Sequence, residues 1–298
     1  MKRWTSFLIV IGVYILAAAA GILSFVFLRQ HINNIILLTF IADVIATLVV
    51  WLFGLAFKNS SMYDPYWSVQ PIVILVAWLI LRNQALNIVD VLMLACIGFW
   101  GIRLTYNWAK GFMGLAQTQD WRYVMLKEKN PKLFFIINLF GINLMPTVLV
   151  YLGVVPFYFV IFGEPSFNIF TSLGMIIMVA ATCIQLIADK QMRDFRNDPA
   201  NAGQVMDKGL WAYSRHPNYL GEILLWWGAY VFSFSNTAAP IYWIAGAVLI
   251  TLLFIFISIP MIEKKLERTR PQYAEYKKRV SMLLLLPPKK AKAETENI

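Results

Sequence analysis

A run of 23 apolar or small residues, from Ser6 to Leu28, constrains the fold of this chain more than any other feature. A helix needs about 20 consecutive apolar residues to cross a bilayer, so this run is long enough for one span. It is also too long for the apolar core of a secretory signal peptide. Charged residues make up 14% of the 298-residue chain, whereas soluble domains contain about one quarter. The sequence therefore predicts an integral membrane protein.

Eight apolar segments predict an all-α bundle of about eight transmembrane helices. The third and seventh segments are short for a full span, so a bundle of seven is the alternative. The fifth segment contains Pro146 and Pro156 and is expected to kink. The segments are 6–28, 34–57, 69–81, 88–104, 134–162, 168–188, 219–234 and 240–261.

Basic residues are distributed very unequally between the two sides that eight crossings define. One side carries 23 of the 26 lysines and arginines, whereas the other carries only Arg29 and Arg82; Arg103 lies within a segment. Because cytoplasmic loops are rich in Lys and Arg, both termini are expected in the cytoplasm. The absence of a retention or transit signal favours a bacterial inner membrane. The net charge of +10 is attributed to this bias and to contact with anionic lipids, and no nucleic-acid partner is expected.

Few reactive side chains lie within the predicted helices. Cys96 and Cys183 are both inside apolar runs, so neither a disulfide framework nor a metal site is expected. Ionisable groups within a membrane are functional candidates, and Asp43, Asp90 and Arg103 are of this kind. A structural hydrogen-bonding role is favoured for Asp43, while pairing with Arg103 and a part in chemistry remain alternatives.

The stretch GLWAYSRHPNYLGE, at residues 209–222, concentrates polar side chains at the start of the seventh helix. Its proline favours an extended conformation at His216 and can begin the helix that follows. Asn218 and Glu222 are four residues apart, one turn along the same helical face. With Arg215 and His216 just outside the helix, the cluster is a candidate anion-binding site. Helix capping alone is the alternative.

Further polar stretches are predicted on the same side of the membrane, namely NSSMYDPYWS, QDWRY and ADKQMRDFR. In the second, Arg122 suits a phosphate group and Trp121 suits stacking on a ring. In the third, Asp189 and Arg196 are seven residues apart, which is two helical turns along one face. These stretches and the 209–222 segment are expected to meet in one site.

Together these stretches resemble the signature of a membrane superfamily that joins steroid 5-alpha-reductases, sterol C14 and delta-7 reductases, and isoprenylcysteine carboxyl methyltransferases. The chain is most similar to the bacterial branch of steroid 5-alpha-reductase-like proteins, long carried as a domain of unknown function. The resemblance covers most of the chain from Asn59 onward. It is carried by GLWAYSRHPNYLGE, NSSMYDPYWS, WGIRL, QDWRY, LIADKQMRDFR and the tail RTRPQYAEYKKRVSMLLLLPP.

The resemblance implies an NADPH-dependent reductase of the membrane. Such an enzyme adds hydride to a C=C bond conjugated to a carbonyl, in a lipophilic steroid-like or isoprenoid-like substrate. The cofactor is expected to enter from the cytoplasmic side of the C-terminal helices. The implied organisation is one transmembrane domain over residues 1–285, whose part from 130 to 285 binds the cofactor. A basic, disordered tail is expected over 286–298.

The same resemblance implies a set of cofactor-binding residues. Asp189 and Arg196 would contact the adenosine and phosphate part of NADPH, and Asn218 and Glu222 would lie at the nicotinamide end. The full expected set is Arg103, Trp121, Arg122, Asp189, Arg196, Arg215, His216, Asn218, Tyr219, Glu222, Tyr273 and Tyr276.

The catalytic residues are harder to assign, because steroid reductases use a Glu and a Tyr on early helices to hydrogen-bond the substrate carbonyl. This chain has no clear equivalent of that pair. Tyr63, Asp64 and Tyr66 are the nearest candidates. A protonated acid or a tyrosine at this position would stabilise the enolate that forms.

Two other functions compete with the reductase. One is a membrane methyltransferase that uses S-adenosylmethionine, because that branch of the superfamily shares the Arg-His-Pro-x-Tyr motif. Glu222 after Gly221 and the pair of Asp189 and Arg196 favour the reductase. The other is a transporter or lipid-binding protein without catalysis, which is disfavoured because the sequence has no internal repeat.

Overall fold

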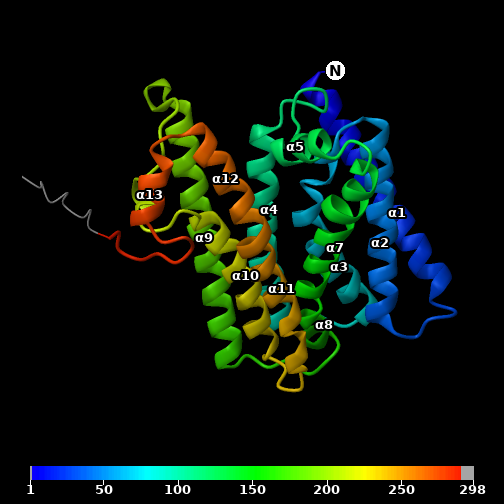
Figure 1. The fold of residues 1–298 in the computed structure, drawn as a ribbon. Helices are drawn as coiled ribbons and strands as arrows, with labels where there is room; N and C mark the ends of the chain where they lie inside the picture. The colour runs from blue at the N-terminus through cyan, green and yellow to red at the C-terminus, as the bar shows by residue number, and fades with distance from the viewer. Residues whose placement is uncertain (1, 290–298) are drawn as a thin grey trace, which may run out of the picture.

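The computed structural model describes residues 2–289, and these residues form a bundle of helices that contains no β-strand (Figure 1). The one pair of bridged residues is Ser214 and Ser281, which joins the start of one helix to the end of the described chain. The predicted all-α class is therefore confirmed. Most of the predicted tail over 286–298 lies outside the described residues.

Seven helical stretches of the described chain are long and apolar enough to cross a membrane. An eighth, α10 (Pro217–Ser233), has 17 residues and is shorter than the other seven. Each of the eight predicted segments falls on one of these elements, so the protein is a multi-pass membrane protein. The seven are α1 (Arg3–Leu28), α2 (Ile35–Ala56), η1 with α3 (Ser60–Tyr63 and Tyr66–Arg82), α4 (Ile88–Gly111), α6 to α8 (Phe134–Ile161), α9 (Ile169–Asn197) and η5 to α12 (Ile241–Thr269).

Two of these stretches contain a π-helical segment. The first consists of α6 (Phe134–Ile136), the π-helical segment η2 (Ile137–Leu144), α7 (Met145–Val154) and α8 (Pro156–Ile161). The second consists of η5 (Ile241–Ile244), α11 (Ala245–Leu253), the π-helical segment η6 (Phe254–Ser258) and α12 (Ile259–Thr269). The first stretch breaks at Pro156, which has no N–H to continue the helix, as its sequence predicts.

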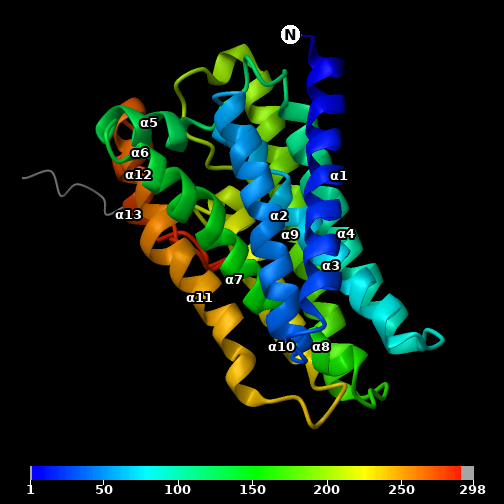
Figure 2. The same cartoon turned by 90° about the vertical axis from the view of Figure 1, so that its right-hand side faces the viewer.

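The short elements gather in the half of the molecule that holds the N-terminus (Figures 1 and 2). They include α5 (Trp121–Lys129), η4 (Gly209–Ala212) and α13 (Tyr273–Arg279), with η3 (Pro199–Asn201) in the same region. The opposite end has only short connections between long helices (Figure 1). The polar stretches identified in the sequence therefore share one end of the bundle.

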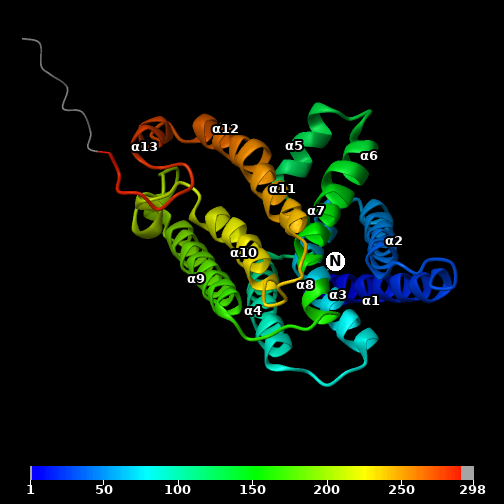
Figure 3. The same ribbon diagram turned by 90° about the horizontal axis from the view of Figure 1, so that it is seen from below.

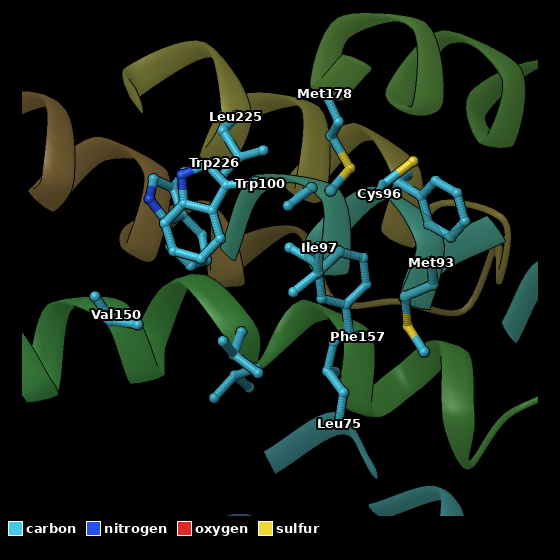
Figure 4. Close-up of a cluster of buried hydrophobic side chains, with 14 of the residues drawn as sticks. Leu75, Met93, Cys96, Ile97, Trp100, Val150, Phe157, Met178, Leu225 and Trp226 are labelled. Carbon is cyan, nitrogen blue, oxygen red and sulfur yellow. The ribbon is translucent and has the colours of Figure 1, made fainter. Parts of the chain in front are cut away.

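The hydrophobic core lies where α3, α4, α7, α8, α9 and α10 meet. Figure 4 shows Trp100 of α4 beside Trp226 of α10, with Phe157 and Met178 in the same cluster. The two tryptophan rings are 5.3 Å apart at 76°, an edge-to-face arrangement that aromatic pairs favour. The core therefore fixes the position of α10 relative to α4 and α9.

Close packing of α9 on α10 depends on glycines. A Cβ atom added at Gly174 would lie 2.5 Å from the backbone nitrogen of Phe232, and one at Gly221 would lie 2.7 Å from the carbonyl oxygen of Ala181. Small residues at such crossings let transmembrane helices approach closely. Gly221 belongs to the GLWAYSRHPNYLGE stretch, so this contact brings that stretch against α9.

The ionisable residue Asp90 has a structural explanation. Asn87 and Asp90 form a reciprocal capping box at the N-terminus of α4. Arg82 at the end of α3 donates to both carboxylate oxygens of Asp90, at 3.0 and 2.8 Å. This paired charge joins α3 to α4 at the end of the bundle opposite the polar loops.

Candidate active site

Two adjoining cavities lie in the half of the bundle that holds the polar loops. The larger, of about 440 Å³, lies among α3, α4, η2, α9, α10 and η6, and we call it the bundle cavity. The smaller, of about 240 Å³, lies among α9, α10, α12 and α13, and we call it the tail cavity. Asp120, Arg122, Asn218 and Tyr219 line both cavities, so the two are continuous at these residues.

All twelve residues expected to bind the cofactor line one or both cavities. The bundle cavity is lined by Arg103, Asp189 and Glu222. The tail cavity is lined by Trp121, Arg196, Arg215, His216, Tyr273 and Tyr276, and Arg122, Asn218 and Tyr219 line both. Of the catalytic candidates, Tyr63 and Asp64 line the bundle cavity, whereas Tyr66 does not. The structure thus brings residues from six separate stretches into one continuous space.

Asn218 and Tyr219 stand at the junction between the two cavities. They occupy the first turn of α10, which begins at Pro217 because proline favours the first helical position. Among the described residues, no protein group hydrogen-bonds to the amide of Asn218 or to the hydroxyl of Tyr219. The Tyr219 ring is held in place by stacking on His216, with ring centroids 5.4 Å apart at 10°. Both polar groups are therefore available to a ligand.

The tail cavity contains two arginines with no carboxylate partner among the described residues. Arg196 comes from the end of α9, and Arg270 follows α12. The hydroxyl of Tyr273, which lines the same cavity, is buried without a hydrogen-bond partner. Because guanidinium groups bind phosphate through several N–H donors, this part of the tail cavity suits an anionic ligand.

Arg215 and His216 line the tail cavity but have other partners. Arg215 donates through Nε to Glu263 at 2.8 Å, and through Nη1 to the carbonyl oxygens of Lys277 and Val280. His216 Nε2 lies 3.1 Å from the same carboxylate oxygen of Glu263. Burial lowers the pKa of His216, and the hydrogen bond to Glu263 only partly offsets this. These residues therefore join the start of α10 to α12 and the tail, and they have little free capacity for phosphate.

Trp121 and Arg122 begin α5, which Asp120 caps. The carboxylate of Asp120 accepts from Arg122 Nε and Nη2, at 2.8 and 2.9 Å. Burial by itself would lower the pKa of Arg122, but these hydrogen bonds raise it above its usual value. The ammonium group of Lys265 lies 4.2 Å from the centre of the Trp121 ring. Arg122 thus stays positively charged, and Asp120 both balances its charge and fixes its position between the two cavities.

An acid and a tyrosine are paired in the wall of the bundle cavity. The hydroxyl of Tyr123 donates to Asp64 Oδ1 at 2.9 Å, and this is the only side-chain hydrogen bond that Asp64 makes among the described residues. Burial raises the pKa of Tyr123 well above its usual value, so the phenol stays protonated. The pair leaves Asp64 Oδ2 open to a ligand in the cavity.

Glu222 has a very different environment, although it also lines the bundle cavity. Its carboxylate accepts from four N–H groups, at distances between 2.9 and 3.3 Å. The donors are the indoles of Trp67, Trp100 and Trp226 and the amide of Gln185. A carboxylate offers about four acceptor positions, so these contacts saturate it. Glu222 therefore joins α3, α4, α9 and α10 at the floor of the cavity.

Gln185 connects Glu222 to the ion pair of Arg103 and Asp189. Arg103 Nη1 donates to Asp189 Oδ2 at 2.7 Å, and its Nη2 donates to the Gln185 side-chain oxygen. Asp189 consequently belongs to the bundle cavity, one cavity away from Arg196, although both residues lie on α9. The pairing also shows that Arg103 does not bind Asp43.

Tyr66 and Asp43 lie outside the two joined cavities. They line a separate apolar cavity of about 430 Å³ among α1, α2 and α3. The Tyr66 hydroxyl donates to Asp43 Oδ1 at 2.9 Å, and Gln70 Nε2 donates to the other carboxylate oxygen. The structural hydrogen-bonding role that the sequence favours for Asp43 is consistent with these contacts.

Sequence reasoning missed several residues that the structure brings to the site. Tyr123 is the last residue of QDWRY, and its pairing with Asp64 crosses 59 positions of sequence. Arg270 lies in the RTRPQY part of the tail, and nothing in the sequence distinguishes it from the other basic residues nearby. The tryptophans around Glu222 read as ordinary apolar residues of a membrane helix. Residues 2–289 contain no cluster of three or more His, Cys, Asp or Glu side chains placed to hold a metal ion.

The fold and the site together define a multi-pass helical membrane protein with two joined, ligand-sized cavities at one end. Residues 50–280 match the sequence profile of the family described as "Protein of unknown function (DUF1295)". This match covers more than half of the chain, and the protein belongs to this family. The match spans both cavities but begins near the end of α2.

A protein of Schizosaccharomyces pombe, named "Uncharacterized protein C594.04c", is 24% identical to this chain over 219 residues. The similarity covers 65% of this chain and 63% of the length of that protein. No solved structure matches the chain.

Proposed function

We propose that the protein is an NADPH-dependent reductase of the steroid 5-alpha-reductase-like superfamily, which reduces a carbonyl-conjugated C=C bond in a lipophilic substrate. The observation that carries the proposal is the free amide of Asn218. It stands where a cavity with two unpaired arginines joins a cavity with a buried acid and tyrosine pair. A molecule that spans this junction would place an anionic group beside the two arginines of the tail cavity and a reactive group in the bundle cavity.

The described residues fit NADPH on this view. Arg196 and Arg270 would bind its phosphate groups, and the unpartnered hydroxyl of Tyr273 would add a hydrogen bond. The rings of Trp121 and Tyr219 would cover its planar parts, and Asn218 would hold the amide of the nicotinamide ring. When bound, NADPH supplies a hydride.

The residues of the bundle cavity would serve the substrate. In its protonated form, Asp64 would donate from its open oxygen to the substrate carbonyl, while its other oxygen accepts from Tyr123, which holds the carboxyl group in place. Such a donor stabilises the negative charge that develops on the carbonyl oxygen during hydride addition. The apolar wall of η2 and η6 excludes water and aligns the substrate.

We also place the joined cavities on the cytoplasmic side of a bacterial inner membrane. The eight-segment topology assigns 23 of the 26 basic residues of the sequence to one side of the membrane, and the positive-inside rule makes that side cytoplasmic. NADPH would then reach the tail cavity directly from the cytoplasm.

A methyltransferase that uses S-adenosylmethionine is the alternative within the same superfamily. The saturated carboxylate of Glu222 no longer separates the two functions, because it binds four protein groups. The separation now rests on Arg196 and Arg270. Two unpaired guanidinium groups suit the phosphates of a dinucleotide, whereas S-adenosylmethionine has none.

The proposal is tested by NADPH oxidation in proteoliposomes that contain a panel of membrane-soluble steroid and isoprenoid enones. At least one enone is expected to be reduced, and Asp64→Ala is expected to lower the rate by roughly 100-fold, in the range for removal of an oxyanion-stabilising donor. Tyr123→Phe should have a smaller effect, because it acts only through Asp64.

Tyr66→Phe is the matched control. Tyr66 also donates to a buried aspartate and lies near Asp64 in sequence, but it faces a different cavity. A panel in which Tyr66→Phe abolishes turnover and Asp64→Ala leaves it unchanged would contradict the assignment of the bundle cavity.

A further inference from the structure

The wall of the bundle cavity contains the two π-helical segments of the described chain. Gly141 and Ile142 belong to η2, and Phe254 and Ile257 belong to η6, and all four line the cavity. Wide π turns are rare, and they occur often at functional sites and at helix kinks. Both π-helical segments, η2 and η6, therefore interrupt the regular α-helix beside the bundle cavity.

Gly141 and Ile257 line the cavity, and both residues have a large exposed fraction. Ile257 is 46% exposed, and the residues next to the pair, Phe140 and Phe256, are 59% and 70% exposed. Such large exposed apolar side chains mark the lipid-facing surface of a membrane protein. Because Gly141 and Ile257 line the cavity and adjoin Phe140 and Phe256, which do not, they mark a candidate opening in the cavity wall.

The helices on either side of this opening separate toward the end that holds the site. α7 packs against α11, but beyond this contact α6 and α12 run apart, with α5 between them (Figure 3). A Cβ atom added at Gly141 would meet only the side chain of Ile137, at 3.9 Å. The space beside Gly141 is therefore open.

The rim of the opening is apolar. The residues that η2, α7, η6 and α12 contribute to the cavity carry no charge, and they include Met145, Pro146 and Met261. The charged lining residues come from other elements: Asp64 precedes α3, Arg103 and Asp189 belong to α4 and α9, and Asp120 and Arg122 lie at the start of α5. A polar solute would find no charged partner at this rim. An apolar molecule that moves there from the bilayer stays in apolar surroundings and is not exposed to water.

We infer that the substrate enters the bundle cavity sideways from the bilayer, through an opening between η2 and η6 whose rim is Gly141 and Ile257. The substrate class is a membrane-dissolved molecule with an apolar body and one polar group that leads toward Asp64. This inference rests on the proposed function for the reaction, but the route depends only on the shape and polarity of the wall. NADPH and the lipid substrate would thus reach the two joined cavities from different phases.

The test is photolabelling of the protein in phosphatidylcholine vesicles that contain a diazirine-bearing sterol. In the unaltered protein, adducts are expected on cavity-lining peptides around Met145 and Met261. Gly141→Trp and Ile257→Trp place an indole in the opening and should lower this labelling by roughly tenfold, the equivalent of about 1.4 kcal/mol. Gly98→Trp is the matched control, since a Cβ at Gly98 meets nothing within 4 Å and Gly98 does not line the cavity, and it should label normally.

NADPH binding by the same variants in detergent is measured in parallel and should be unchanged. Cavity labelling that persists at full yield in both rim variants would overturn the route, as would the absence of cavity adducts in the unaltered protein. If cavity labelling persists in both rim variants while NADPH still binds, the lateral route is rejected and the proposed reductase is retained. Failure to bind NADPH, with labelling blocked only at the rim, would reject the reductase and retain the route.

Discussion

Glu222 and Asp64 are both carboxylates that line the bundle cavity, but their partners give them different capacities. Four N–H donors saturate Glu222, whereas Asp64 accepts one hydrogen bond, from Tyr123. A saturated carboxylate holds helices together, and an open one is available for chemistry. At this scale the sequence identified the polar residues but not their partners, because pairings such as Tyr123 with Asp64 depend on tertiary contacts.

Glu222→Gln should destabilise the protein. The new amide would direct N–H groups at indole donors, which leaves at least one buried donor unsatisfied at a cost of about 1–3 kcal/mol. We expect the midpoint of thermal unfolding in detergent to fall by roughly 2–4 °C per kcal/mol. The exposed carboxylate of Glu275 provides the control, and equal midpoints for Glu222→Gln and Glu275→Gln would contradict the anchoring role.

Arg270→Ala and Arg196→Ala should each weaken NADPH binding. A hydrogen bond to a charged group contributes about 1.5–3 kcal/mol, so each change should raise the Kd by roughly tenfold or more. The control is Arg268→Ala, since Arg268 lies only two residues before Arg270 but does not line the tail cavity. Fluorescence titration measures the three constants, and an unchanged Kd for both cavity variants would place the phosphates elsewhere.

Among the elements, the start of α10 is joined to α12 and α13 by a buried ionic cluster around Glu263. Glu263 of α12 binds Arg215, His216 and Lys277, and Arg215 also binds two carbonyl oxygens of the α13 region. The sequence predicted the apolar part of each long helix, because these runs are continuous. It did not predict that α4, α9 and α12 continue through polar residues to Gly111, Asn197 and Thr269. It did not predict the π-helical segments η2 and η6, which depend on packing around the bundle cavity rather than on a residue pattern.

Glu263→Gln should loosen the cover of the tail cavity. Removing one partner from a buried ionic cluster costs about 3–5 kcal/mol, and here the loss falls on contacts between α12 and α13. Hydrogen exchange is expected to quicken over Tyr273–Arg279 and to stay unchanged in α1. Glu267→Gln is the control, because Glu267 pairs with Lys277 at the surface. Equal exchange in the two variants would show that the cluster does not hold α13.

For the whole molecule, the number of crossings depends on α10. Seven elements are long enough to span a membrane, and α10 is shorter, with 17 residues. The unequal distribution of basic residues favours a crossing by α10, because an even number of spans places nearly all lysines and arginines on one side. The sequence alone predicts this topology, but the joined cavities emerge only once the helices are packed.

Cysteine labelling measures the topology directly. In a Cys183→Ser background, which removes the exposed native thiol, single cysteines replace Lys2, Glu164 or Glu275. With eight crossings, a membrane-impermeant maleimide should label Lys2→Cys and Glu275→Cys from the same side and Glu164→Cys from the other. Labelling of Lys2→Cys and Glu275→Cys from opposite sides would mean seven crossings.

The central claim is that the junction at Asn218 binds NADPH, and calorimetric titration of the purified protein tests it most directly. We predict that NADPH binds at one site per chain and that S-adenosylmethionine does not bind. Asn218→Ala should weaken NADPH binding by roughly two- to tenfold, since an amide that hydrogen-bonds the ligand contributes about 0.5–1.5 kcal/mol. Binding of S-adenosylmethionine at the Asn218 junction, with no heat from NADPH, would contradict the reductase and support the methyltransferase.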